Sequence, residues 1–154
     1  MEYELTPEYI MMIHEDNIKT YGGEYGIREQ GTFEMLCEAP YQSIFGTDLY
    51  PTLFDKAAKF VEGFATHQVF YDGNKRTGLG AMNHLLNANG YELTMINTEV
   101  YQFVLDIANH KYSSIEKIAD VIKSNVRQGF QLPNNICKEN DQPELNDECL
   151  ENRD

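Results

Sequence analysis

Asp72-Gly73-Asn74-Lys75-Arg76-Thr77 is the most informative stretch of this sequence, because a polar loop ends there and a strongly patterned helix begins. The first backbone N–H groups of a helix have no partner within it, and the positive end of the helix dipole lies beside them. The apolar positions of this helix recur every three or four residues until Asn89-Gly90 supplies a stop: Leu79, Met82, Leu85 and Leu86. The sequence therefore predicts an anion-binding helix start at residues 72–77.

Each residue type in this stretch suits a nucleotide polyphosphate. Gly73 lets a phosphate approach the backbone, Asn74 adds an amide donor, and Lys75 and Arg76 add positive charge. The Asp72 carboxylate would either hold Mg²⁺ against the phosphates or receive a proton from an attacking hydroxyl. The alternative interpretation is an ordinary turn and N-cap with a solvated Lys-Arg pair. Two bases in a first turn oppose the dipole preference for acids, however, and a bound anion would relieve that conflict.

Helical patterns occupy most of the chain before this stretch. Thr6-Pro7 opens a helix that Gly22-Gly23 ends, and Thr32 is a candidate cap for a short helix that Pro40 ends. An apolar stripe predicts a further helix from about Pro51 to His67.

The pattern after Asn89-Gly90 is weaker. Residues 91–96 are too short to anchor a sheet but leave room for a hairpin-like extension, and Asn97 or Thr98 can cap the next helix. Ser113 and Glu116 have capping-box spacing for a last helix. We therefore predict an all-α fold of about six helices.

Domain organisation follows from length and composition. The 154 residues suffice for one domain, which we expect to span residues 1–130. Residues 131–154 are rich in Pro, Asn and acids, and they offer too little apolar burial to offset the entropy of ordering, so we expect a disordered acidic tail.

Charge and composition exclude several function classes. A net charge of -13 argues against a broad grip on nucleic-acid phosphates. No apolar stretch approaches the roughly 18 residues that a membrane span requires, and Met1–Thr6 lack the basic start of a secretion signal. Three cysteines without metal-type clustering suit reduced thiols, so we expect a cytoplasmic protein.

The stretch Phe70-x-Asp72-Gly73-Asn74-Lys75-Arg76-Thr77 resembles the core motif of the Fic/Doc family, H-x-F-x-[DE]-[AG]-N-[GK]-R, in the Asn-Lys-Arg form typical of the Doc-like toxin branch. Residues 13–23 and 26–31 resemble the first helix and the flap of Doc-like proteins, and Asn89-Gly90 resembles the stop after the motif helix. The resemblance covers roughly residues 5–127. It implies a compact Fic/Doc helical bundle with a short β-hairpin flap.

One position departs from the family motif. The family's catalytic histidine belongs six residues before Asn74, where this chain has Gln68. A neutral amide cannot accept a proton as imidazole does, and such general-base contributions are typically about 10²–10⁴-fold. His67 is one residue, or about 100° of helix rotation, out of register, so we interpret it as a bystander. We expect packing or surface roles for His14, His84 and His110.

The resemblance implies a function and a set of partners. Doc-type members transfer the γ-phosphoryl of ATP to a threonine of elongation factor Tu, whereas Fic members usually transfer AMP, and Lys75 favours the first reaction. Gln68 occupies the base position, Asp72 assists the base or binds Mg²⁺, Lys75 and Arg76 act on the phosphates, and Gly73, Asn74 and Thr77 complete the nucleotide site. No inhibitory [ST]-x-x-x-E-[GN] pattern is present in the sequence, so a separate Phd-like antitoxin is the expected partner.

Three alternatives stay open. The chain could be an AMP transferase, or a non-catalytic module that binds nucleotide or a partner. Gln68 could also have been introduced in place of histidine to silence a toxic enzyme, because Gln68→His would restore the whole motif in register.

Overall fold

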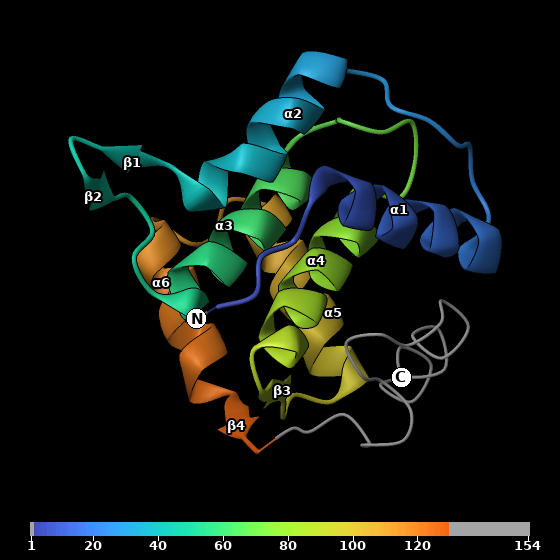
Figure 1. The fold of residues 1–154 in the computed structure, drawn as a ribbon. Helices are drawn as coiled ribbons and strands as arrows, with labels where there is room; N and C mark the ends of the chain where they lie inside the picture. Colours follow the sequence, from blue (N-terminus) through green and yellow to red (C-terminus); the bar gives the residue numbers. More distant parts are fainter. Residues whose placement is uncertain (1, 130–154) are drawn as a thin grey trace, which may run out of the picture.

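The computed structural model describes residues 2–129, which form six α-helices and two small antiparallel strand pairs (Figure 1). The predicted all-α fold of about six helices is confirmed. The helices are α1 Pro7–Tyr21, α2 Gln30–Glu38, α3 Leu53–Thr66, α4 Asn74–Ala88, α5 Asn97–Ala108 and α6 Ile115–Ser124, with a 3₁₀ turn, η1, at Ala39–Tyr41.

Helix α1 begins where its capping residue predicts, and α3 lies within the range 51–67 that its apolar stripe predicts. The Thr6 hydroxyl accepts a hydrogen bond from the Tyr9 N–H, and Gly22, with a positive φ of 84°, closes the other end of α1. Thr52 and Asp55 form a reciprocal capping box at the start of α3.

The first residues or N-caps of three other helices differ from the prediction. Helix α2 begins at Gln30 with Glu29 as N-cap, so Thr32 lies inside the helix. The N-cap of α5 is Ile96, because the carboxylate of Glu99 accepts its N–H and replaces a side-chain cap from Asn97 or Thr98. Helix α6 is capped by Ser114 rather than Ser113, since the Ser114 hydroxyl accepts from the Lys117 N–H.

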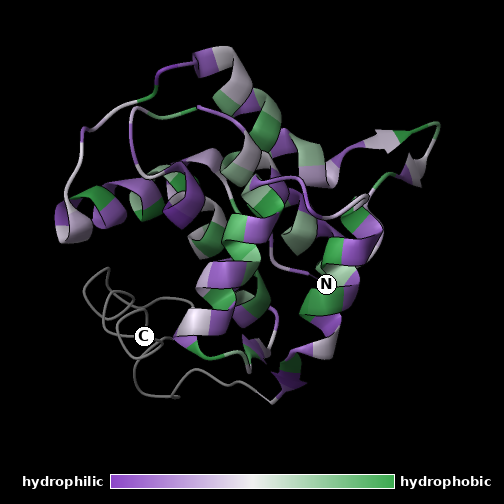
Figure 2. Cartoon of the chain, turned by 180° about the vertical axis from the view of Figure 1, so that it is seen from behind, coloured by the Kyte–Doolittle hydropathy of each residue, from purple (hydrophilic) through white to green (hydrophobic). Residues whose placement is uncertain are grey.

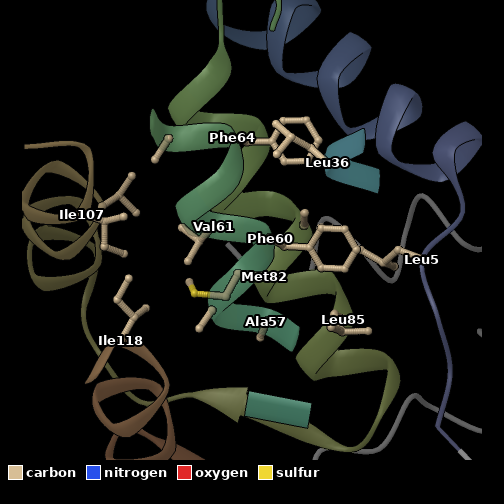
Figure 3. Packing of buried hydrophobic residues seen from close by; sticks show 14 of the residues in the cluster. Leu5, Leu36, Ala57, Phe60, Val61, Phe64, Met82, Leu85, Ile107 and Ile118 are labelled. Atoms are coloured by element: carbon tan, nitrogen blue, oxygen red, sulfur yellow. The ribbon is translucent and has the colours of Figure 1, made fainter. Parts of the chain in front are cut away.

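Helix α3 is the centre of the core. Its apolar face is buried, and Figure 3 shows Val61 of α3 and Met82 of α4 on the side of Ile107 and Ile118, with Phe60 and Phe64 of α3 on the side of Leu5 and Leu36. Figure 2 shows hydrophobic and hydrophilic residues alternating along the helices, as expected for elements with one buried face.

Two glycines of α4 allow its neighbours to approach closely. A Cβ at Gly78 would lie 3.1 Å from the Val61 carbonyl oxygen of α3, and a Cβ at Gly80 would lie 2.6 Å from the Ile13 Cγ2 of α1. Helix α4 therefore packs closely between α3 and α1, against backbone of α3 at Gly78 and against a side chain of α1 at Gly80.

The strands are short. Strand β1, Ser43–Ile44, pairs with β2, Thr47–Asp48, in a hairpin that projects on the opposite side of the fold from α1, with Phe45 fully exposed at its turn (Figure 1). The structure thus has a short β-hairpin at residues 43–48, while residues 26–31, which resemble the flap, contribute the single antiparallel bridge of Ile27 with Phe70. Residues 91–96 contribute β3, Tyr91–Leu93, but its partner is β4, Val126–Gln128, with Leu93 opposite Val126.

The predicted tail at residues 131–154 lies outside the described residues, and the expected domain boundary at 130 stays a prediction. Within residues 2–129, no helix is both long enough and apolar enough to cross a bilayer.

Candidate functional site

The loop between α3 and α4 carries the predicted motif, and Phe70 anchors it to the core. Phe70 is fully buried, and its ring stacks on the His14 imidazole of α1 with centroids 3.8 Å apart and planes 9° from parallel. The ring of Phe64 of α3 lies nearly parallel to that of Phe70 at 5.9 Å. These contacts fix the loop that precedes the start of α4.

The Asn74 side chain closes this loop. Its Oδ1 accepts from the Phe70 N–H at 2.8 Å, and its Nδ2 donates to the Phe70 carbonyl at 3.0 Å. We expected the Asn74 amide to serve a phosphate, but the structure uses its oxygen and one of its N–H groups to shape the loop. Asn74 therefore acts on the site chiefly by holding the backbone in place.

A second segment runs beside the loop. Ile27 forms an antiparallel bridge with Phe70, and the N–H groups of Arg28 and Glu29 both donate to the Val69 carbonyl. In Figure 1 the light-green α3–α4 connection lies between α2 and α1, with the blue α1–α2 connection outside it. The α1–α2 connection therefore forms one wall of the site.

The start of α4 has the properties of an anion site. Gly73 is the N-cap, in the left-handed conformation with φ 79°, and it brings no side chain to cap the first-turn N–H groups. The first turn contains no acid, while Lys75 and Arg76 are both exposed there. The uncapped N–H groups and the two exposed basic residues thus share the first turn of α4, and a donor set of this kind fits ATP phosphates.

Asp72 is held by the α1–α2 connection. Its Oδ2 accepts a hydrogen bond from the backbone N–H of Glu24 at 2.7 Å, and Gly23 approaches so closely that a Cβ there would lie 3.0 Å from the Asp72 Cβ. The residue is exposed, and its Oδ1 is the oxygen that could face a metal. Residues 2–129 contain no cluster of three metal-binding side chains, so Mg²⁺ at Asp72 would need phosphate oxygens and water as its other ligands.

Thr77 lies beneath the candidate anion site rather than on its surface. It is fully buried, its Oγ1 lies 3.4 Å from the His14 Nδ1, and its N–H donates to the Gly73 carbonyl at 2.9 Å. The structure therefore gives Thr77 a supporting role in place of the predicted contact with nucleotide, because both its hydroxyl and its N–H face the protein.

His14 packs against the buried side of the loop between α3 and α4. It is fully buried, and a Cβ at Gly73 would lie 3.7 Å from its Nδ1, so the ring lies against Phe70, Gly73 and Thr77. Its Nε2 is buried without a hydrogen-bond partner among the described residues. Burial lowers the pKa of His14 below its ordinary value of 6.5, which favours the neutral ring. The predicted packing role of His14 is confirmed, at a place directly under the motif.

Gln68 and His67 lie on the exposed part of the loop before Phe70. His67 is the C-cap of α3, and its Nδ1 lies 2.8 Å from the Gly63 carbonyl oxygen, which can only accept. That contact requires a proton on Nδ1 and ties the His67 ring to the end of α3.

Sequence reasoning missed three contributors to this site: His14, Tyr21 and the Gly23-Glu24 pair. The Arg76 guanidinium carbon lies 4.4 Å from the centre of the Tyr21 ring. All these contributors lie in or after α1, about fifty residues or more before the motif in the sequence, and only packing brings them to it. The glycines at 78 and 80 were the available signal, because a helix interior with Gly-x-Gly indicates closely packed neighbours.

Comparison with known proteins identifies a family and relatives for this chain. A family model described as the Fic/DOC family matches residues 4–86, slightly more than half of the chain. The chain is 37% identical over 73 residues to "Toxin Doc" of Mycolicibacterium smegmatis (strain ATCC 700084 / mc(2)155), a match that covers 47% of this chain and 56% of that relative. It is 26% identical over 119 residues to "Protein kinase doc" of Escherichia phage P1, which covers 77% of this chain and 92% of that relative.

Proposed function

The chain belongs to the Fic/DOC family, and from that premise we propose that it is a Doc-like toxin that transfers the γ-phosphoryl group of ATP to a hydroxyl of elongation factor Tu. The observation that carries the proposal is the start of α4, where an uncapped first turn that bears Lys75 and Arg76 directly follows the tethered Asp72. The names of the two relatives, one a toxin and one a protein kinase, support the reaction class.

Each residue has a defined part in the proposed reaction. Lys75, Arg76 and the first N–H groups of α4 would hold the phosphates, and Asp72 would orient Mg²⁺ or the attacking hydroxyl. ATP, when bound, supplies the phosphoryl group. The hydroxyl oxygen bonds to the γ-phosphorus as the bond from that phosphorus to the ADP oxygen breaks. In the family motif the hydroxyl proton passes to the histidine whose place Gln68 takes here, so in this chain the Asp72 carboxylate would have to accept it.

Gln68 weakens this last step. A glutamine amide has no basic lone pair at neutral pH, so we propose that the chain binds ATP but transfers phosphate slowly. A non-catalytic module that binds nucleotide is the second candidate function, and the exposed Gln68 is the observation that favours it. In either case we propose a cytoplasmic setting in a bacterium or phage-infected cell, and a Phd-like antitoxin as the partner.

The test of binding is titration calorimetry with Mg²⁺ and ATP. We expect Arg76→Ala to weaken the binding of ATP by about tenfold or more, which corresponds to the energy of a hydrogen bond to a charged group. Arg127→Ala, which removes an exposed arginine of β4, serves as the matched control. Equal affinities for the chain and Arg76→Ala would contradict the proposed site.

The test of reaction type uses the chain and its Gln68→His form with a bacterial lysate and either γ-labelled or α-labelled ATP. We expect Gln68→His to raise γ-label incorporation into one translation-factor band by about 10²–10⁴-fold. Incorporation of α label would assign AMP transfer instead. Tight ATP binding with no label from either nucleotide would favour the binding module.

A further inference from the structure

Tyr21 and Arg76 form a contact that links the end of α1 to the first turn of α4. The Arg76 guanidinium carbon lies 4.4 Å from the centre of the Tyr21 ring, within the range of a cation–π contact. Tyr21 is the last residue of α1 and is 61% exposed, and Arg76 is the third residue of α4. The pair therefore lies on the surface, next to the candidate anion site.

The packing of α1 on α4 fixes the position of the tyrosine. Gly80 brings Ile13 of α1 against α4, and one helical turn before Tyr21 the Ile18 side chain lies against both Gly23 and Gly73. Gly22 then ends α1 with its N–H bonded to the Ile18 carbonyl. The backbone under Tyr21 is thus held in place by contacts that do not involve its ring.

The chemistry of the contact leaves the arginine available for an anion. A guanidinium that stacks its flat face on an aromatic ring keeps its N–H donors in its own plane, where they point outward from its edge. A carboxylate partner would occupy those donors in a bidentate pair. Among residues 2–129, no carboxylate lies within ion-pair distance of Arg76.

We propose that Tyr21 is a positioning residue that orients the Arg76 guanidinium for the phosphates at the start of α4. The inference rests on the proposed function, because it assigns Arg76 the phosphate contact. By restricting the rotamers of a long, flexible side chain before ligand arrives, the ring reduces the entropy lost on binding.

The test is a double-mutant cycle on the affinity for ATP with Mg²⁺, measured by titration calorimetry on the full chain. The four proteins are the chain, Tyr21→Ala, Arg76→Ala and the double variant. We expect Tyr21→Ala to weaken the binding of ATP by about two- to fivefold, which corresponds to the energy of a cation–π contact at an exposed site. In the Arg76→Ala background, Tyr21→Ala should have no further effect, because the ring then has no guanidinium to orient.

Two further variants separate positioning from a general structural effect. Tyr21→Phe keeps the aromatic face and should bind ATP as the chain does. Tyr101→Ala removes a tyrosine of similar exposure, 64%, from α5 and should also leave the affinity unchanged. Thermal melting of each variant checks that the fold is intact.

The outcomes distinguish this inference from the function on which it rests. If Arg76→Ala binds ATP as tightly as the chain, the proposed function fails. If Arg76→Ala weakens binding but Tyr21→Ala leaves it unchanged or tightens it, the positioning role is overturned and the proposed function stands. An equal loss from Tyr21→Ala in both backgrounds overturns it as well, since the effect would then not pass through Arg76.

Discussion

The Asp72 carboxylate accepts a hydrogen bond from the backbone N–H of Glu24, a residue 48 positions earlier in the chain, at 2.7 Å. The bond ties the acid of the motif to the connection between α1 and α2. Gly23 makes this approach possible, because its φ of 119° suits glycine and a side chain there would press on Asp72. The direction in which the carboxylate points is therefore set partly by α1 and the loop after it.

We predict that Asp72→Asn and Asp72→Ala separate the tether from the charge. Asparagine keeps an acceptor oxygen for Glu24, so its free energy of unfolding should stay close to that of the chain, whereas alanine should lose about 1 kcal/mol for the missing hydrogen bond. Both variants should lose the Mg²⁺ dependence of ATP affinity. Urea denaturation and titrations with and without Mg²⁺ measure the two effects, and an Asp72→Asn protein that still responds to Mg²⁺ would contradict the metal role.

Local signals predicted much of the fold. The cap at Thr6, the apolar stripe of residues 51–67 and the stops at Gly22 and Asn89 are short-range signals, so helices α1, α3 and α4 could be placed closely from sequence. The start of α5 could not, because the carboxylate of Glu99 reaches back to the Ile96 N–H although better capping residues follow.

Long-range contacts could not be predicted in the same way. Strand β3 pairs with β4, about thirty residues later in the chain. The sequence of residues 91–96 does not indicate which segment pairs with it. The candidate site likewise combines residues that the local sequence indicates with residues that only long-range packing brings there. Its charged residues are consecutive and were visible in the sequence, while His14 under the loop and Tyr21 beside Arg76 depend on how α1 packs on α4.

We predict that His14 makes the stability of the fold sensitive to acid. Burial lowers its pKa below 6.5, so the unfolded chain binds a proton more readily than the folded one. This contribution to stability is fully present above about pH 6.5 and is lost as the pH falls toward the lowered pKa. Between pH 7.5 and 5, the melting temperature of the chain should therefore fall more than that of His14→Gln, which cannot titrate.

The matched control is His110→Asn, which removes an exposed histidine just after α5 and keeps a residue type that tolerates its positive φ of 58°. Its melting temperature should follow the pH as that of the chain does. If the melting temperature of His14→Gln fell between pH 7.5 and 5 as much as that of the chain, other titrating groups would cause the acid sensitivity.

We predict that Gly80→Ala destabilises the protein although alanine is the better helix former. A Cβ at this position would lie 2.6 Å from the Ile13 Cγ2, and overpacking of this kind typically costs about 1–3 kcal/mol. Ile13→Leu removes the branch at Cβ, so the double variant should recover part of the loss. Urea denaturation of the three variants gives the comparison, and a stabilising Gly80→Ala would show that α1 can move away without penalty.

We predict that deletion of residues 131–154 leaves the fold unchanged. The segment from 133 to 154 has seven acids against two bases, and its composition offers little apolar area to bury. The melting temperature of a chain that ends at residue 130 should lie close to that of the full chain. A large decrease would show that this segment contributes to stability.

The last prediction concerns which residue accepts the proton. His67 has its Nδ1 at the Gly63 carbonyl and is the C-cap of α3, one residue out of register with the family motif. We expect His67→Ala to leave the ATP affinity unchanged, and also to preserve the γ-phosphoryl transfer that Gln68→His supports, because the imidazole introduced at position 68 is the one in register. The measurement is γ-label incorporation for the chain, each single variant and the double variant. Loss of a basal activity on His67→Ala alone would instead assign the proton to His67, and the loop before Phe70 would then have to shift by one residue during the reaction.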